Sequence, residues 1–307
     1  MVVEEPVVEE PKDLTSKFNG SEVENQTYHA IAVMIGNTSE ARPQSGLSLA
    51  DVVYEISVET MTITRYMAIF SSVYPDKVGP IRSVRIPFVL MLHEWDIGIA
   101  HYGGSSATEA NALKLLENTY VPIRYDGVEG INTDFFSRDS ARVAPHNAYM
   151  DMEEASATIP DMWPRKHFTF NDEATYVGDA AKEVHINYTS SIRNGYVYNE
   201  TLGLYEKYLN DKPQVDAYND QTITASNIIV QHAEHSIVGT KQYVLVEFLY
   251  TGVAEYFIDG IHTTGRWVKD FEDDITHWYD ANDQEVEFQP GHTWIHIVPD
   301  SATISYK

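Results

Sequence analysis

The sequence predicts an α+β protein of two lobes, in which an N-terminal mixed α/β lobe with a central sheet precedes a β-rich C-terminal lobe. The first half alternates apolar runs of strand length with helical periodicity, whereas the second half repeats short strand patterns separated by turn residues. A turn-rich stretch between residues 159 and 179 separates the two patterns. With 43% hydrophobic and 12% aromatic residues, a chain of 307 residues has ample material for a packed core.

Three regions follow from these patterns. Residues 1–22 are expected to form an acidic tether, because their repeated VVEEP unit has no periodicity that could bury one face. Residues 23–165 are expected to form the N-terminal lobe and residues 166–307 the C-terminal lobe.

The first elements of the N-terminal lobe are predicted from their apolar runs. Residues 28–35 and 65–71 indicate buried strands, and residues 50–55 indicate a short strand or a helical turn. Between residues 83 and 95, apolar side chains recur at three- and four-residue steps. This spacing predicts a helix with one buried face.

The rest of this lobe contains a histidine at a predicted strand end. The run 97–100 predicts a short strand that delivers His101 to its end. Ser106 and Glu109 have the spacing of a capping box, which predicts a helix that continues to residue 118. The amino terminus of such a helix would favour an anion beside His101. A further helix is predicted at 148–157.

The C-terminal lobe shows repeated hairpin patterns. Short strands are predicted at residues 191–198, 204–209, 228–230, 242–250, 254–258, 265–269, 276–279, 285–288 and 293–298.

The charge and the residue types exclude several classes of protein. The formal net charge is −25, from 46 acidic and 21 basic residues, so we expect no nucleic-acid partner. The absence of cysteine excludes disulfides, thiolate nucleophiles and Cys-ligated zinc. No run of about 18 apolar residues is present to span a bilayer.

Several motifs together resemble a known family. They are Arg42-Pro43-Gln44-Ser45-Gly46-Leu47-Ser48, Ala50-Asp51-x-Val53-Tyr54-Glu55, Thr64-Arg65, Gly79-Pro80-x-Arg82-Ser83-x-Arg85, His101-x-Gly103-Gly104-Ser105, Gly265-x-Trp267-x-Lys269, Thr276 and Pro290-Gly291-x-Thr293-Trp294-Ile295. This pattern is similar to that of the YerB-like lipoproteins of Gram-positive bacteria, a family of unknown function, from about residue 27 onward.

The resemblance implies a two-lobed α+β protein outside the cytoplasm, tethered to the cell membrane through a lipidated N-terminal cysteine. This sequence has no cysteine, so the anchor and the signal peptide are expected to precede Met1. The family carries no established reaction. The membrane is therefore expected as a partner only through that anchor.

The strongest candidate site is a set of charged residues in the N-terminal lobe. Arg65, Arg82 and Arg85 could hold a carboxylate or phosphate, with Glu55 and Glu59 orienting the guanidinium groups. The same residues could instead form an ion-pair network that only stabilises the lobe.

Further candidates surround this set. His101, with Gly103, Gly104 and Ser105 after it, could act as an acid or base or could be a core histidine bonded to a backbone carbonyl. Three more residues could complete the pocket, namely Arg42, Arg142 and His146. The pair His146 and Asn147 could equally cap a helix.

We predict no metal and no cofactor. His232 and His235 lie near a strand end, where side chains three apart face opposite ways. His292 and His296 share a strand face but lie too far apart for one zinc ion.

Two functions remain open. In the first, the protein binds an anionic or carbohydrate ligand of the cell envelope, such as a cell-wall fragment, or docks a cell-wall enzyme. In the second, it is a hydrolase or lyase that acts on cell-wall material, with His101 and Glu55 or Glu59 as acid and base and Arg82 holding an anionic group.

Overall fold

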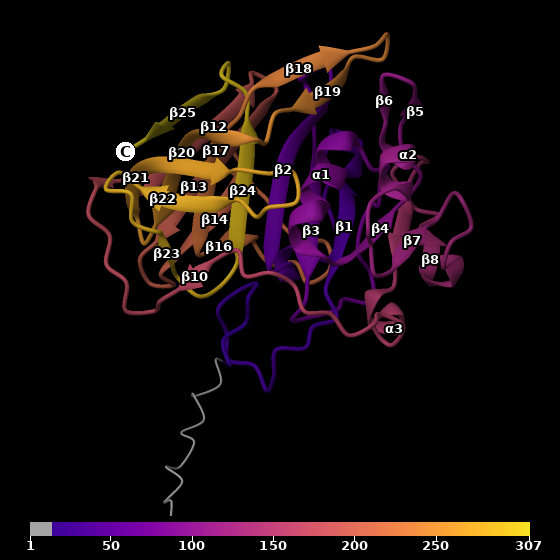
Figure 1. Ribbon diagram of the computed structural model, residues 1–307, viewed down its shortest axis with the longest axis horizontal. Helices are drawn as coiled ribbons and strands as arrows, with labels where there is room; N and C mark the ends of the chain where they lie inside the picture. The colour runs from indigo at the N-terminus through magenta and orange to yellow at the C-terminus, as the bar shows by residue number, and fades with distance from the viewer. Residues whose placement is uncertain (1–13) are drawn as a thin grey trace, which may run out of the picture.

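Strands dominate the computed structural model, which describes residues 14–307 (Figure 1). Within these residues the largest element is one sheet of 13 strands. Its main path runs through β11 (Asp179–Ala180), β21 (Ile261–Lys269), β20 (Tyr250–Ile258), β17 (Asn227–His232), β24 (Thr293–Val298), β2 (Val52–Glu59), β3 (Ile63–Phe70), β1 (Ile31–Gly36), β4 (Gly98–His101) and β7 (Arg124–Asp126), and it is extended by β18 (His235–Val238), β19 (Tyr243–Val246) and β22 (His277–Asp280).

This sheet joins the two halves of the chain. β24 lies parallel to β2, with His296 opposite Glu55, while its other edge pairs with β17. β2 in turn pairs with β3 of the first half. The central sheet predicted for the N-terminal lobe therefore belongs to both halves. Pairing between strands so distant in sequence leaves no local pattern, which is why residue periodicity alone could not predict it.

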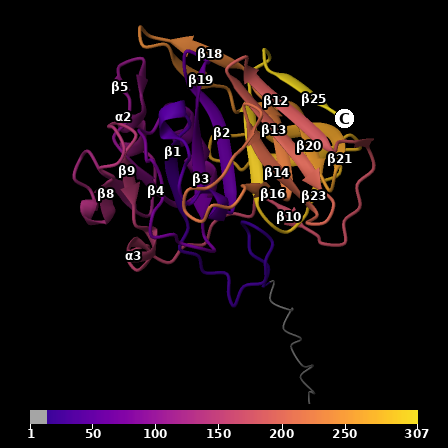
Figure 2. The same cartoon turned by 180° about the vertical axis from the view of Figure 1, so that it is seen from behind.

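A smaller sheet covers the back of the large one (Figure 2). It consists of β15 (Lys212–Pro213), β14 (Leu204–Leu209), β13 (Ile192–Asn199), β12 (Glu183–Thr189) and β25 (Thr303–Tyr306), with β16 (Thr224–Ala225) paired to β14. Three strand pairs complete the β structure, formed by β10 (Thr169–Phe170) with β23 (Glu287–Phe288), β5 (Ser106–Ala107) with β6 (Ala110–Asn111), and β8 (Phe136–Arg138) with β9 (Ala148–Met150).

Helix α1 (Ile86–Trp95) lies over the opposite face of the large sheet (Figure 1). The other helices are α2 (Ala112–Glu117) and α3 (Met152–Ser156), with short 3₁₀ turns at Ser39–Ala41, Leu47–Leu49 and Thr133–Phe135. The indole of Trp95 in α1 donates to the hydroxyl of Tyr54 at 3.1 Å. Glu55, the next residue of β2, instead faces the smaller sheet, where the hydroxyl of Tyr188 donates to its carbonyl. Both faces of β2 are thus covered.

This coverage explains the strand compositions. All six residues of β1 are buried, as expected for a strand covered on both faces. β12 instead alternates buried and half-buried positions, because one face of the smaller sheet meets solvent.

Two predicted helices are wrong in part. Residues 106–111 form the β5–β6 hairpin, and α2 begins only at Ala112, where the side chain of Asn111 accepts from the Lys114 amide. Ser106 and Glu109 therefore cap no helix. Within residues 148–157, β9 pairs with β8 before α3 begins, and Asp151 caps α3 by accepting from the Glu154 amide. Tertiary pairing overrode helix propensity in both places.

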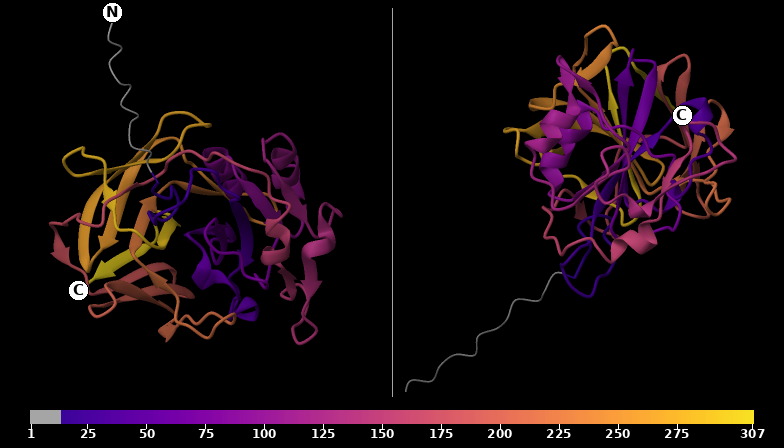
Figure 3. Two further views of the ribbon diagram at one scale, coloured as in Figure 1. Left: turned by 90° about the horizontal axis from the view of Figure 1, so that it is seen from below. Right: turned by 90° about the vertical axis from the view of Figure 1, so that its right-hand side faces the viewer.

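The first described residues belong to the folded core. Phe18 is completely buried and stacks on Trp95 with ring centroids 5.3 Å apart. The first 13 residues of the predicted tether lie outside the described part. The C-terminus lies at the opposite end of the molecule from α2 and α3 (Figures 1 and 3).

Candidate functional site

A β-bulge in β2 determines which of the two candidate glutamates, Glu55 or Glu59, lies beside the arginines. Strand register places Ile56 opposite Arg65 and Ser57 opposite Thr64, but then shifts so that Glu59 lies opposite Ile63. Side chains two apart on a strand share a face, so Glu59 lies on the face of Arg65. Without the bulge, Glu59 would share the face of Glu55.

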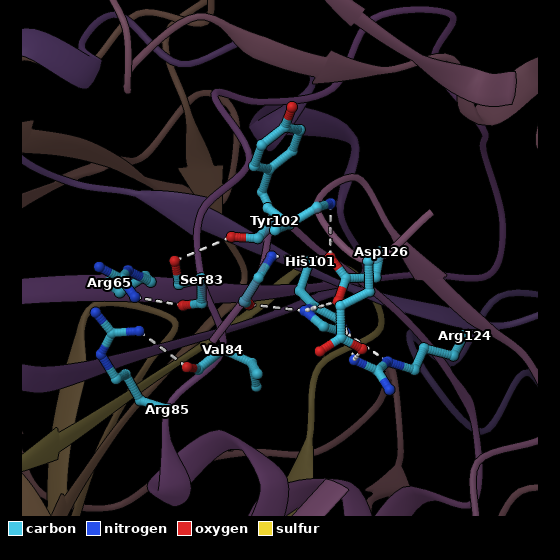
Figure 4. A network of polar contacts seen from close by, with 11 residues as sticks. Arg65, Ser83, Val84, Arg85, His101, Tyr102, Arg124 and Asp126 are labelled. Atoms are coloured by element: carbon cyan, nitrogen blue, oxygen red, sulfur yellow. Dashed lines mark hydrogen bonds and ion pairs between the residues drawn. The ribbon is translucent and has the colours of Figure 1, made fainter. Parts of the chain in front are cut away.

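Glu59 is the carboxylate that two of the predicted arginines share. Arg85 donates to its Oε1 from Nε at 2.7 Å and also from the terminal nitrogen Nη2, while Arg65 lies 3.7 Å from its Oε2. Burial alone would raise the pKa of Glu59, but the charges of Arg65 and Arg85 outweigh it and hold the pKa below its usual value. Arg65 also donates to the carbonyl of Ser83 (Figure 4).

Positive charge exceeds negative charge in this cluster. Burial and the neighbouring charge of Arg85 lower the pKa of Arg65 to about 9, which still leaves it protonated at neutral pH. The predicted grouping of Arg65 and Arg85 with Glu59 is therefore present, with more guanidinium charge than one carboxylate can balance.

Glu55 does not join this cluster. Its side chain is fully buried and accepts from Asn37 at 3.1 Å and Thr64 at 2.7 Å. His296, across the strand pair, lies 3.4 Å from the second carboxylate oxygen. Glu55 therefore belongs to the contact between the two sheets.

His101 is held by internal partners on both ring nitrogens. Nδ1 lies 2.8 Å from the carbonyl of Gly103, and because a carbonyl only accepts, Nδ1 donates. Arg124 donates from Nε to Nε2 at 2.9 Å, and Arg124 also pairs with Asp126 (Figure 4). Burial lowers the pKa of His101, which keeps the ring neutral. This histidine is a buried structural residue, as in the second interpretation of its sequence context.

The residues that follow His101 also make internal contacts. Gly103 has a φ of +66° and donates its amide to Asp126 at 2.9 Å. A Cβ on Gly104 would lie 2.7 Å from the side chain of Leu113, so any larger residue there would have to displace that leucine. Ser105 is buried and accepts from the Ala112 amide. The anion site expected beside a long capped helix is absent from residues 101–117, because α2 is short and begins later than predicted.

The remaining candidates form an open cavity. It has a volume of about 560 Å³ and is lined by Glu40, Arg42 and residues 142–146, which include Arg142 and His146. Arg42 donates to the Asn37 carbonyl at 2.6 Å. Arg142 donates to the carbonyls of Ala41 and Pro43, at 3.1 and 2.7 Å.

Arg82 borders this cavity from the side of the arginine cluster. Its guanidinium donates to the carbonyl of Pro145 at 2.7 Å, and Pro145 lines the cavity. Burial, and after it the charge of Arg82, lowers the pKa of His146. Burial and the nearby guanidinium group thus both disfavour a proton on this histidine, whereas the charge of Glu40 acts in the opposite direction.

Four arginines have no carboxylate partner among residues 14–307. They are Arg42, Arg82, Arg138 and Arg142. Arg138 donates to Asn147 at 2.6 Å, so all four bond to residues 138–147 or to the 37–43 loop beside them. In a chain with 46 acidic residues, two such arginines in the lining of one cavity and a third at its border are an unusual concentration of positive charge. Guanidinium groups of this kind bind carboxylates and phosphates. We call this cavity, with Arg42 and Arg142 in its lining and Arg82 at its border, the arginine pocket.

Sequence reasoning missed two buried charged groups of the second half. Lys207 is fully buried and donates to Asn194 and Tyr196 within that half, and Tyr196 bonds to His296 at 2.7 Å. Asp216, also buried, accepts from the amides of Gly46 and Ser48. The one available signal was a charged residue at an inward position of an alternating strand, as at Lys207 in β14.

The histidines considered for zinc lie apart from one another. His232 bonds to Glu255 at 2.9 Å, His235 to the Ala233 carbonyl, and His292 to the Ala50 carbonyl. No cluster of three or more metal-binding side chains occurs in the described part of the chain.

The molecule is a mostly β protein of two regions that share one sheet, with an arginine-lined cavity in the first. Its residues 16–165 match the N-terminal domain of the family described as "Protein of unknown function (DUF3048)", and residues 184–295 match that family's C-terminal domain. The chain belongs to this family, as the resemblance of its motifs implies.

Known relatives agree with this assignment. The chain is 29% identical over 308 residues to a Bacillus subtilis (strain 168) protein named "Putative lipoprotein YerB", covering 96% of this chain and 89% of the relative. The crystal structure of the YerB protein from Bacillus subtilis superposes with a TM-score of 0.82 at 26% identity and covers 95% of this chain and 99% of that one. Among residues 14–307, no helix has both the length and the apolar character needed to cross a membrane.

Proposed function

We propose that this protein is an envelope protein, tethered outside the cell membrane, that binds an anionic cell-wall ligand in the arginine pocket. The name of the Bacillus subtilis relative, "Putative lipoprotein YerB", supports the tether. The ligand is one that carries carboxylate or phosphate groups.

One observation carries the ligand proposal. Three arginines without a carboxylate partner in the described residues lie at a cavity of about 560 Å³, with Arg42 and Arg142 in its lining and Arg82 at its border, in a molecule whose formal net charge is −25. If these arginines served stability alone, we would expect them to form ion pairs with the carboxylates that are abundant on so acidic a surface. Here they are fixed by backbone carbonyls instead, which leaves part of each guanidinium free to bind an anion.

The acid–base alternative lacks support in this geometry. Both nitrogens of His101 are bonded to internal groups, and Glu55 is fully buried. Glu59 is engaged by two arginines, and its lowered pKa makes it a poor proton donor at neutral pH. A binding role therefore fits these residues better than hydrolysis or elimination does.

The test is a binding assay with purified cell-wall peptidoglycan, with and without its phosphate-bearing polymers. We expect the wild type to bind at low salt and to be released as salt rises. Because two anion-binding groups are lost, Arg82→Gln with Arg142→Gln should weaken binding at least about tenfold. Removing the phosphate polymers distinguishes the two kinds of ligand. Binding that is lost after removal indicates a phosphate ligand, and binding that remains indicates a carboxylate ligand.

Arg266→Gln is the matched control, because Arg266 is ion-paired with Asp283 on the surface of the other half. It should bind as the wild type does. Equal binding by the double variant and the wild type would refute the arginine pocket as the site.

A further inference from the structure

The solvent-facing side of the smaller sheet contains a notch at Gly195. Gly195 in β13 is the cross-strand neighbour of His185 in β12 and of Tyr208 in β14, so these three residues form one row across the sheet. Its φ is not positive, so the backbone does not require glycine there. A glycine inside a strand often marks a place where a ligand approaches the backbone closely.

The missing side chain leaves a cavity of about 340 Å³. A Cβ on Gly195 would lie 3.4 Å from the Cβ of Tyr208 and 3.9 Å from Nδ1 of His185. The notch is therefore bounded by Tyr208 on one side and by His185 on the other, with Asn187 and Arg193 in the adjoining row.

The polar groups of the notch are arranged to receive hydroxyl groups. Nε2 of His185 lies 2.9 Å from Oε1 of Glu183, and because a carboxylate only accepts, Nε2 donates. In the neutral ring Nδ1 is then an acceptor on the side of the notch. Oδ1 of Asn187 is buried and has no hydrogen-bond partner among residues 14–307. Buried acceptors of this kind normally have a donor, so the lining of the notch holds one unsatisfied acceptor close to Nδ1 of His185.

Arg193 adds donors at the same site. It bonds to the Ser190 carbonyl at 2.8 Å and to the carboxylate of Asp211, which fixes its guanidinium beside the notch. A ligand that fits must combine hydroxyl donors, oxygen acceptors and a flat face for Tyr208. A sugar ring has all three.

We infer that the notch over Gly195 is a binding subsite for one pyranose ring, with sugar hydroxyls donating to His185 and Asn187 and one ring face lying against Tyr208. This site is on the sheet of the second half and does not depend on the arginine pocket. It requires none of the four unpaired arginines.

The test fills the notch without touching its polar groups. Gly195→Val should keep or raise the melting temperature, because valine favours strands and glycine disfavours them. Binding of N-acetylglucosamine and its β-1,4-linked tetramer to the full chain would be followed by saturation-transfer NMR and by calorimetric titration. Because the added side chain occupies the sugar's position, we expect affinity to fall at least about tenfold.

Ser305→Val is the matched control, because Ser305 is exposed on the same face, next to His185 but outside the cavity. It should bind the sugars as the wild type does. If Gly195→Val fails to fold, Gly195→Ala serves in its place, since its Cβ would make only ordinary contacts. A wild type that binds neither sugar overturns the inference, and so does a folded notch-filling variant that binds them undiminished.

Discussion

At the scale of single residues, burial strongly changes the pKa of Lys207. It lies on β14 with no exposed surface, and its ammonium group lies 4.5 Å from the ring centroids of both Tyr196 and Trp294. Burial lowers the pKa of Lys207 from 10.5 to about 7, despite the opposing charge of Glu55. A lysine so placed costs stability while it is protonated.

This pKa predicts how stability depends on pH. Between about pH 7 and 10.5 the folded chain has lost a proton that the unfolded chain keeps, so raising the pH favours the folded state. Between pH 7 and 9 the free energy of unfolding should rise by about 2 kcal/mol. Below pH 7 this contribution should be flat. Urea unfolding across this range measures it.

Lys207→Met removes the titrating group and should abolish most of this rise. The control Lys212→Met, at an exposed position, should keep it. A rise that persists in Lys207→Met would show that another group is responsible.

At the scale of elements, the loop 44–48 is held in place by residues from the second half of the chain. The carboxylate of Asp216 accepts from the amides of Gly46 at 2.8 Å and Ser48 at 2.6 Å. Gln44 accepts from Gln214 at 3.3 Å and, through its carbonyl, from the Ala217 amide. This part of the family motif therefore docks one half on the other.

Loss of this carboxylate should loosen the loop. Asp216→Ala leaves the amides of Gly46, Ser48 and Tyr218 without their acceptor, which should cost about 3 kcal/mol. Urea denaturation measures the cost, and hydrogen exchange at Gly46 and Ser48 should become faster. Glu200→Ala, at an exposed ion pair with Lys182, should change the free energy of unfolding little. Unchanged exchange at the two amides would contradict the docking role.

At the scale of the whole molecule, the two family domains are joined by one sheet and by a buried ion pair. The β2–β24 pairing crosses the boundary between them, as does a buried ion pair between Glu94 of α1 and Lys269 of β21 at 2.8 Å. Thr276 donates to the same carboxylate from its amide at 2.9 Å. Neither region has its full set of contacts without the other.

We therefore expect one cooperative unfolding transition. In calorimetry the van't Hoff and calorimetric enthalpies should agree for the whole chain. Lys269→Met leaves Glu94 buried without its cation and should lower the melting temperature of that single transition without splitting it. A fragment of residues 14–182 should be unfolded by circular dichroism, because β2 loses β24. Two resolved transitions, or a folded fragment, would contradict this expectation.

Local sequence patterns determined much of the secondary structure. The apolar run at 28–35 covers all of β1 except its last residue, Gly36, and the helical spacing at 83–95 contains α1. Both were predictable because the burial of a strand or of one helix face leaves a pattern in neighbouring residues. The sequence also offered Arg42, Arg82 and Arg142 as candidate binding residues, and the structure places Arg42 and Arg142 in the lining of one cavity with Arg82 at its border.

Tertiary structure decided which of these groups meet. Glu55 and Glu59 have the spacing of one strand face, yet a bulge sends Glu59 to the arginines and leaves Glu55 against His296. His101 stands at a strand end as predicted, but Arg124 and Gly103 occupy both of its nitrogens. Register shifts and long-range partners depend on contacts between distant segments, and those contacts have no periodicity in the chain from which they could be predicted.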